Sequence, residues 1–169
     1  MTTIPPHGLS KQEVLDRLAE FRRDDKDWRG GRVLGYNYDP GAAAAEVAEA
    51  AFLNYLGDNS LDPTTFPSMK RLECEVVRML AHLLRGDEHV VGNFTSGGTE
   101  SILLAVKTAR DRARALRPEI DKPEMVLPLT AHCAIHKAAR YFDVKPVVTP
   151  FDVRTFRADV DDMLAAINE

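Results

Sequence analysis

The segment Thr95–Ser101 holds the residues whose types and spacing best suit anion binding, and we call it the glycine loop. Its sequence is Thr-Ser-Gly-Gly-Thr-Glu-Ser, directly after the apolar run 90–94. Gly97 and Gly98 have no side chains, so backbone N–H groups can approach a ligand, and Ser96 can add a hydroxyl donor. A helix that starts here would direct its positive N-terminal end at the anion. The loop therefore predicts a phosphate site, with a tight strand-to-helix turn as the alternative.

Two other motifs fit the glycine loop less well. A Walker loop ends in Gly-Lys-Ser/Thr, whereas Gly98 is followed by Thr99 and Glu100. A hydrolase elbow centred on Ser96 requires a glycine two residues earlier, where Phe94 stands. Nucleoside triphosphates and serine-hydrolase chemistry are therefore disfavoured.

A second group of candidate residues surrounds His132, in the segment Thr-Ala-His-Cys-Ala-Ile-His-Lys at 130–137. This segment also joins an expected strand to an expected helix, so it should lie at the same edge of the sheet as the glycine loop. The His132 ring could lie against a planar cofactor, and a surface or capping histidine is the alternative. His132 and His136 have a spacing compatible with zinc, but no third ligand is evident, so no metal site is predicted.

Alternating strand and helix patterns from residue 90 onward predict an α/β fold with a parallel sheet. We expect strands at 90–94, 125–129 and 144–148, and helices at about 99–116, 131–142 and 159–167. This region belongs to an expected domain over residues 58–169.

Residues 1–57 are expected to form a separate N-terminal helical segment. Ser10 and Glu13 have the spacing of a capping box, which predicts a helix start. Asp39 as N-cap and Pro40 at the first helical position predict an alanine-rich helix that continues to about Leu56. The loop that follows is long and rich in turn residues, and a further helix should stop at Gly86.

The composition narrows the class of protein. The 169 residues include 26 acids and 22 bases that are interspersed along the chain with no basic block, and the net charge is -4, so nucleic acid is not an expected partner. No apolar run reaches the roughly 20 residues that a membrane-spanning helix needs. Cys74 and Cys133 are far apart and no signal peptide is recognisable, which favours free thiols in the cytoplasm.

The motifs together resemble the sphingosine-phosphate lyases, a group within the decarboxylase family that depends on pyridoxal 5'-phosphate (PLP). The resemblance extends from about Gly35 to the end of the chain. It is carried by the glycine loop, by the segment from His132 to Ala139-Arg-Tyr-Phe142, and by Phe66-Pro67 leading into Arg71-Leu-Glu73.

This resemblance implies the type I fold of the aspartate aminotransferases, in which residues 58–169 would be the first part of the large PLP-binding domain. It implies a homodimer in sphingolipid and carboxylic acid metabolism that takes a small amine as substrate. The reaction would be retro-aldol cleavage of a carbon–carbon bond in an amino alcohol, with PLP as the electron sink. A PLP-dependent amino-acid decarboxylase is the alternative.

The resemblance also assigns roles to the candidate residues. Gly97, Gly98 and Thr99 would hold the PLP phosphate, with Ser96 as a cofactor-binding residue that supports the turn. His132 would stack on the pyridine ring and is a catalytic candidate.

Three further residues match positions near the substrate. Tyr38, also a catalytic candidate, and Asn59 would line the substrate site; a partly buried aromatic and a simple turn residue are the alternatives. Asp62 stands where lyases of phosphorylated long-chain bases generally have a histidine that receives the substrate phosphate. A carboxylate would repel that phosphate, which weakens the assignment of the substrate but not that of PLP.

PLP enzymes also need a lysine that forms a Schiff base with the cofactor and an acid that pairs with the pyridinium nitrogen. In this family both follow the part that resembles residues 35–169. We therefore expect the chain to be part of a longer enzyme. A non-catalytic binding module that lacks the lysine is the alternative from another class.

Overall fold

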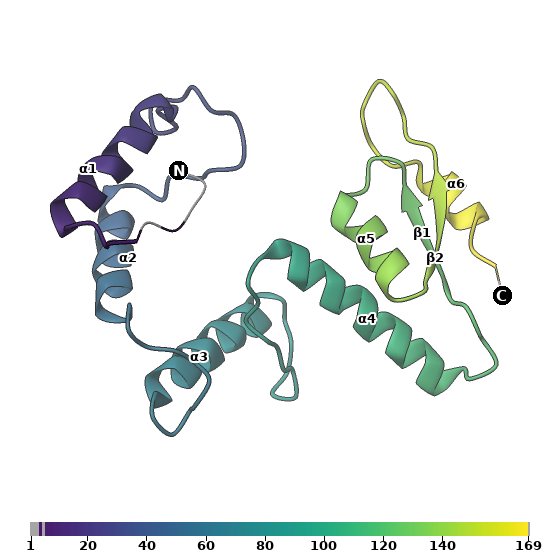
Figure 1. Ribbon diagram of the computed structural model, residues 1–169. Helices are drawn as coiled ribbons and strands as arrows, with labels where there is room; N and C mark the ends of the chain where they lie inside the picture. The colour runs from purple at the N-terminus through teal and green to yellow at the C-terminus, as the bar shows by residue number, and fades with distance from the viewer. Residues whose placement is uncertain (1–3, 5, 169) are drawn as a thin grey trace. The chain divides into compact units, whose positions relative to one another are not determined.

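The computed structural model describes residue 4 and residues 6–168. The chain divides into two units, Met1–Phe66 and Pro67–Glu169 (Figure 1).

The first unit contains two helices, α1 (Lys11–Phe21) and α2 (Ala42–Asn54), with a short 3-10 helix at Arg22–Asp24 after α1. The predicted capping box is confirmed. The Ser10 hydroxyl accepts a bond of 3.3 Å from the Glu13 N–H, and the Ser10 N–H donates to the Glu13 carboxylate over 2.7 Å. Each contact satisfies a backbone N–H that the start of the helix would otherwise leave without a partner.

The predicted start of α2 is wrong. Asp39 is not the N-cap, because its carboxylate accepts the N–H of Gly41 over 2.9 Å and closes a tight turn across Pro40. Gly41 takes the N-cap position with φ of +83°, a left-handed conformation that favours glycine. The helix therefore begins at Ala42 rather than at Pro40.

The second unit contains the α/β part of the chain. Its elements in order are α3 (Pro67–Leu83), α4 (Gly98–Leu116), β1 (Glu124–Pro128), α5 (Cys133–Tyr141), β2 (Lys145–Thr149) and α6 (Val160–Ala165). The two strands pair in parallel with Val126 opposite Val147, and α5 connects them. The predicted parallel pairing is confirmed for these two strands.

The strand predicted at 90–94 is wrong for the part of the chain that the structure describes. This run has no ladder partner there, and Val91 is 89% exposed. The N–H of Phe94 instead donates to the Glu73 carboxylate of α3 over 2.8 Å. An apolar run becomes a strand only where another strand offers ladder hydrogen bonds, so its apolar pattern alone was not sufficient.

Two helices end on a residue that is not glycine in the left-handed region. Arg85 follows α3 with φ of +59°, and Asp143 follows α5 with φ of +54°. In each case the next N–H returns to a carbonyl of the last turn: Gly86 to Ala81 over 2.8 Å, and Val144 to Ala139 over 2.9 Å. These bonds satisfy carbonyls at the helix end and direct the chain from α5 into β2.

Small side chains dominate the core of the second unit. Ala138 has no exposed surface, and the other buried apolar residues are Leu127, Ala134, Ala139 and Val144. Alanines allow α5 to approach β2 and α4 closely, and both contacts are present. None of the described residues of Met1–Phe66 is buried. The packing that holds β1, α5 and β2 together is therefore the main source of tertiary stability in the described chain.

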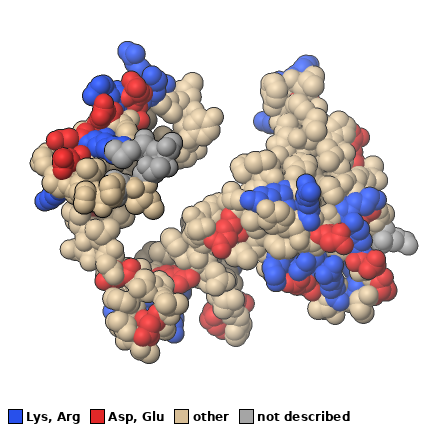
Figure 2. Space-filling model, in the orientation of Figure 1, with Lys and Arg blue, Asp and Glu red and all other residues tan. Residues whose placement is uncertain are grey.

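Charged side chains of both signs are interspersed on the visible face of the second unit (Figure 2). Among the helices that the structure describes, none has the length and apolar character needed to cross a membrane.

Replacing Ala138 with leucine should destabilise this core. The larger side chain has no free volume at a position without exposed surface, so we expect Ala138→Leu to lower the opening free energy of the β1 and α5 amides by about 1–3 kcal/mol. Native-state hydrogen exchange measures this quantity. Ala115→Leu makes the same change at an exposed position of α4 and should leave those amides within about 0.5 kcal/mol. Equal effects of the two substitutions would contradict the assignment of the core.

Candidate cofactor site

The glycine loop leaves the N-terminus of α4 without a side-chain cap. Gly97 is the N-cap and has no side chain to accept the first N–H groups of the helix. The first return bond is from the Ser101 N–H to the Gly97 carbonyl, over 3.1 Å. The N–H groups that precede it belong to the unsatisfied first turn of the helix, where the helix dipole is positive. An anion can accept hydrogen bonds from these groups.

The Glu100 side chain forms hydrogen bonds within the glycine loop. One oxygen of its carboxylate accepts both the N–H and the hydroxyl of Ser96, each over 2.7 Å. These bonds, the one from the backbone N–H first, hold the pKa of Glu100 below its ordinary value. The Ser96 hydroxyl proton is therefore used within the loop, so Ser96 supports the turn in this structure.

A second tie joins the two ends of the loop. The hydroxyl oxygens of Thr95 and Ser101 are 2.7 Å apart, and Thr95 also donates to the Gly97 carbonyl over 3.2 Å. These hydroxyls stabilise the turn. Of the predicted phosphate-binding residues, Gly97, Gly98 and Thr99 thus lie together at the helix start.

Helix α3 determines where the glycine loop begins. The Glu73 carboxylate accepts the N–H of Phe94, immediately before the loop. Gly92 lies against Val77 of the same helix, where an added Cβ would be 3.1 Å from the nearest side-chain atom. We did not predict this role of Glu73 from the sequence, because it depends on contacts between residues that are far apart in the chain.

His132 lies at the carboxyl end of β1 and is the N-cap of α5. Its Nδ1 accepts the N–H of Ala134 over 3.1 Å, so in the neutral ring the proton is on Nε2. The imidazole is exposed and its orientation is determined by this cap. Among the described residues, no group of three or more His, Cys, Asp or Glu side chains could hold a metal ion.

The remaining predicted residues lie in the unit Met1–Phe66. Tyr38 is 87% exposed. Asn59 accepts the Leu61 N–H over 3.0 Å and so has the geometry of a turn residue.

Asp62 forms a more extensive local network. Its carboxylate accepts the N–H and hydroxyl of Thr64, at 2.8 and 2.7 Å, and the hydroxyl of Thr65 at 2.7 Å. These bonds, the one from the Thr64 side chain first, lower the pKa of Asp62 to about 2. Asp62 is therefore a permanent negative charge at neutral pH.

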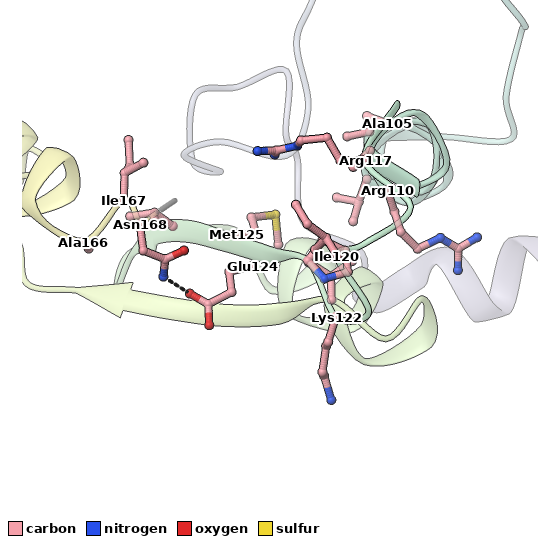
Figure 3. Close-up of a pocket in the computed structure, with 16 residues that line it drawn as sticks. Ala105, Arg110, Arg117, Ile120, Lys122, Glu124, Met125, Ala166, Ile167 and Asn168 are labelled. Atoms are coloured by element: carbon pink, nitrogen blue, oxygen red, sulfur yellow. Dashed lines mark hydrogen bonds between the residues drawn. The ribbon is translucent and has the colours of Figure 1, made fainter. Parts of the chain in front are cut away.

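A cavity of about 710 Å³ does not include the predicted site residues (Figure 3). It lies between α4 and β1 and extends to the residues after α6. Much of its lining is apolar, including Ala105, Met125 and Ile167. Two polar residues of the lining, Glu124 and Asn168, bind each other over 2.8 Å. The basic residues of the lining are Arg110, Arg117 and Lys122.

Known proteins resemble this chain over almost its whole length. It is 40% identical to sphingosine-1-phosphate lyase 1 of Rattus norvegicus, over 98% of this chain and 29% of the rat protein. It is 36% identical to the sphingosine-1-phosphate lyase of Drosophila melanogaster, over 98% of this chain and 30% of that protein. No family model matches.

A solved structure resembles the chain equally clearly. The structure of Burkholderia pseudomallei sphingosine-1-phosphate lyase matches all of this chain and 40% of its own, with a TM-score of 0.87 and 32% identity. The chain is homologous to part of the sphingosine-1-phosphate lyases. A glutamate decarboxylase of Lactobacillus brevis matches with a TM-score of 0.71 at 24% identity, which shows a shared fold. The expected type I fold is confirmed, and the chain spans about a third of the length of the lyases it matches.

The closure of the glycine loop should depend on pH through Glu100. Because its pKa is lowered in the folded chain, the stabilisation is fully present above the ordinary glutamate pKa of about 4.3 and is lost as pH falls through the lower folded value. We expect the hydrogen-exchange protection factor of the Ser96 amide to fall over this range in the wild type and to be insensitive to pH in Glu100→Gln. Glu119→Gln, outside the loop, should behave as the wild type does. A wild-type protection factor that stays constant down to pH 2 would contradict this role.

Proposed function

We propose that the protein containing this sequence is a PLP-dependent carbon–carbon lyase that cleaves an amino alcohol, and that this chain supplies its phosphate site and its ring-stacking histidine. The observation that carries the proposal is the open start of α4 at Gly97 and Gly98, in a chain homologous to the sphingosine-1-phosphate lyases. PLP, when bound, supplies an electron sink for breaking a bond at the substrate α-carbon.

The glycine loop fits a phosphate group. A Cβ built on Gly97 or Gly98 meets no described atom within 4 Å, so a ligand oxygen has room to approach the backbone there. The free N–H groups of the first helical turn are donors of the kind that binds phosphate in other proteins. Thr99 lies in the same turn and can add its hydroxyl. The negative charge of Glu100 opposes an anion, but its carboxylate is engaged by Ser96.

His132 fits the role of a ring that covers one face of the cofactor. Its Nδ1 is held by the Ala134 N–H, which fixes the ring while leaving Nε2 with a proton to donate to a substrate oxygen. A histidine whose orientation is held by a backbone N–H of its helix loses little conformational entropy when a ligand binds.

The substrate is proposed from the residues of the first unit. Tyr38 and Asn59 would line its site, and Asp62 would face it. Because Asp62 remains ionised at neutral pH, its negative charge favours the substrate amine over a phosphate. We therefore propose an amine substrate whose anionic group, if present, lies away from Asp62.

An amino-acid decarboxylase is the second candidate. The chain is 33% identical to a probable L-aspartate decarboxylase of Pyrococcus furiosus, over 98% of this chain and 42% of that protein. The two reactions differ in their product, because the lyase releases an aldehyde and the decarboxylase releases carbon dioxide. A homodimer, as the resemblance implies, and a location in the cytoplasm, as the separated cysteines favour, are part of the same proposal.

Filling the glycine loop should weaken cofactor binding without disturbing the fold. Gly98→Val places a side chain in the open space above the first turn of α4, and we expect PLP and inorganic phosphate each to bind at least about tenfold more weakly, a loss of ~1.4 kcal/mol. Phosphorus NMR titration of the chain measures both affinities. Gly57→Val, at another open glycine, is the matched control and should bind as the wild type does. Undiminished binding by Gly98→Val would place the phosphate elsewhere.

A further inference from the structure

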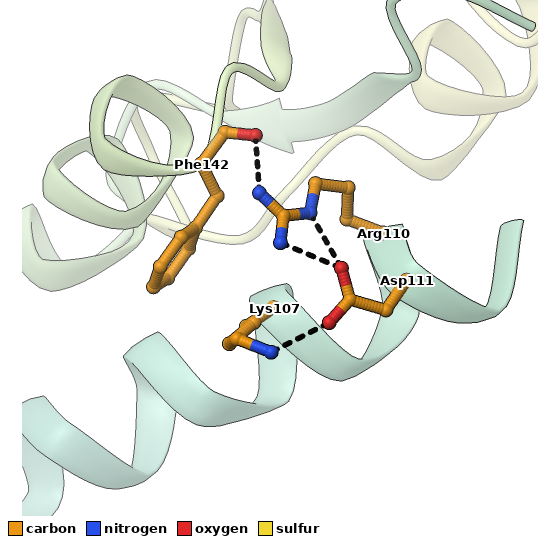
Figure 4. A network of polar contacts seen from close by, with 4 residues as sticks. All are labelled: Lys107, Arg110, Asp111 and Phe142. Carbon is orange, nitrogen blue, oxygen red and sulfur yellow. Dashed lines mark hydrogen bonds and ion pairs between the residues drawn. The ribbon is translucent and has the colours of Figure 1, made fainter. Parts of the chain in front are cut away.

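Arg110 joins α4 to the end of α5 (Figure 4). Its side chain is only 16% exposed. It donates from Nη1 to the Phe142 carbonyl over 3.1 Å, and its guanidinium lies 5.3 Å from the centre of the Phe142 ring. One residue of α4 thus contacts both the backbone and the side chain of the C-cap of α5.

The contact satisfies a group that a helix end leaves open. Phe142 is the C-cap of α5, at the negative end of the helix dipole, where a cation is favourable. Asp111 holds the guanidinium through bonds of 2.8 and 2.6 Å to Nε and Nη2, and Lys107 in turn binds Asp111. Contacts within α4 therefore hold the guanidinium in the orientation in which it contacts α5.

The candidate cofactor residues lie at the N-terminal ends of the two helices, away from the contact between Arg110 and Phe142. Figure 1 shows α4 and α5 running in the same direction, and they are in contact. At 1.5 Å per residue, Arg110 is about 18 Å along α4 from Gly98, and Phe142 is about 15 Å along α5 from His132. A helix is stiff over such lengths. The contact between Arg110 and Phe142 therefore also determines the position of His132 along the helix axes relative to Gly98.

We propose that Arg110 is a positioning residue that aligns His132 with the glycine loop, so that one PLP molecule can reach both. This inference rests on the proposed function, because it assigns phosphate and ring contacts to the two helix starts. Arg110 does not touch the cofactor. It acts by determining how far α5 is shifted along α4 and how α5 is rotated about its own axis.

The inference predicts that phosphate and ring contacts can be separated. Inorganic phosphate needs only the glycine loop, whereas PLP needs the loop and His132 together. Arg110→Met should therefore weaken PLP binding about tenfold, the size of one charge-assisted hydrogen bond, while phosphate affinity stays within about twofold. Arg110→Lys keeps a cation near the Phe142 carbonyl but loses the two-nitrogen contact to Asp111, so its PLP affinity should be intermediate.

The experiment is phosphorus NMR titration of the full chain and each variant with inorganic phosphate and, separately, with PLP. Arg112→Met is the matched control, since Arg112 is an exposed arginine of the same helix and should bind both ligands as the wild type does. Unchanged PLP affinity in Arg110→Met, or equal losses for phosphate and PLP, would overturn the positioning role. If Arg110→Met does not fold, the same comparison in Arg110→Lys decides. A wild-type chain that binds phosphate but not PLP would instead reject the proposed function, and the inference with it.

Discussion

The close packing of α5 against β2 and α4 is the constraint on which the described α/β unit depends. Alanines at 134, 138 and 139 are buried, and their small size permits the approach that parallel pairing of β1 and β2 requires. Right after β1 the chain must turn back to form α5, so His132 is placed at the carboxyl edge of the strands. The N-cap bond then fixes its ring. A core contact thus determines where a candidate functional side chain lies.

Two opposing effects act on an anion at the glycine loop: the free backbone N–H groups attract it, and the charge of Glu100 repels it. The start of α4 attracts an anion through its free N–H groups, while the carboxylate of Glu100 lies close by and opposes one. Ser96 engages that carboxylate with two hydrogen bonds, which stabilises the loop in the shape that exposes Gly97 and Gly98. The same acid therefore weakens the attraction for an anion and maintains the geometry that binding needs.

Local patterns in the sequence predicted those features that depend on neighbouring residues. The capping box at Ser10, the helix after Gly97 and the parallel pairing around α5 follow from such patterns. The start of α2 was missed because two local bonds competed for Asp39, and the turn over Pro40 prevailed. A strand at 90–94 could not be judged locally, because strand formation depends on a partner.

Contacts between distant residues could not be predicted at all. The bond from Phe94 to Glu73 joins residues 21 apart in the sequence, and the bond from Arg110 to Phe142 joins residues 32 apart. Neither has a periodic or compositional signal. Both determine how the candidate residues are held, which is why the sequence indicated the residue types of the site but not the supports that position them.

The most direct test of the account is to map PLP on the chain residue by residue through amide and imidazole NMR shifts. The account predicts the largest changes at Gly97, Gly98 and Thr99, together with ring-current shifts of the His132 imidazole protons. It predicts no comparable change along α1. Shifts confined to the cavity between α4 and β1, with the glycine loop and His132 unaffected, would contradict it.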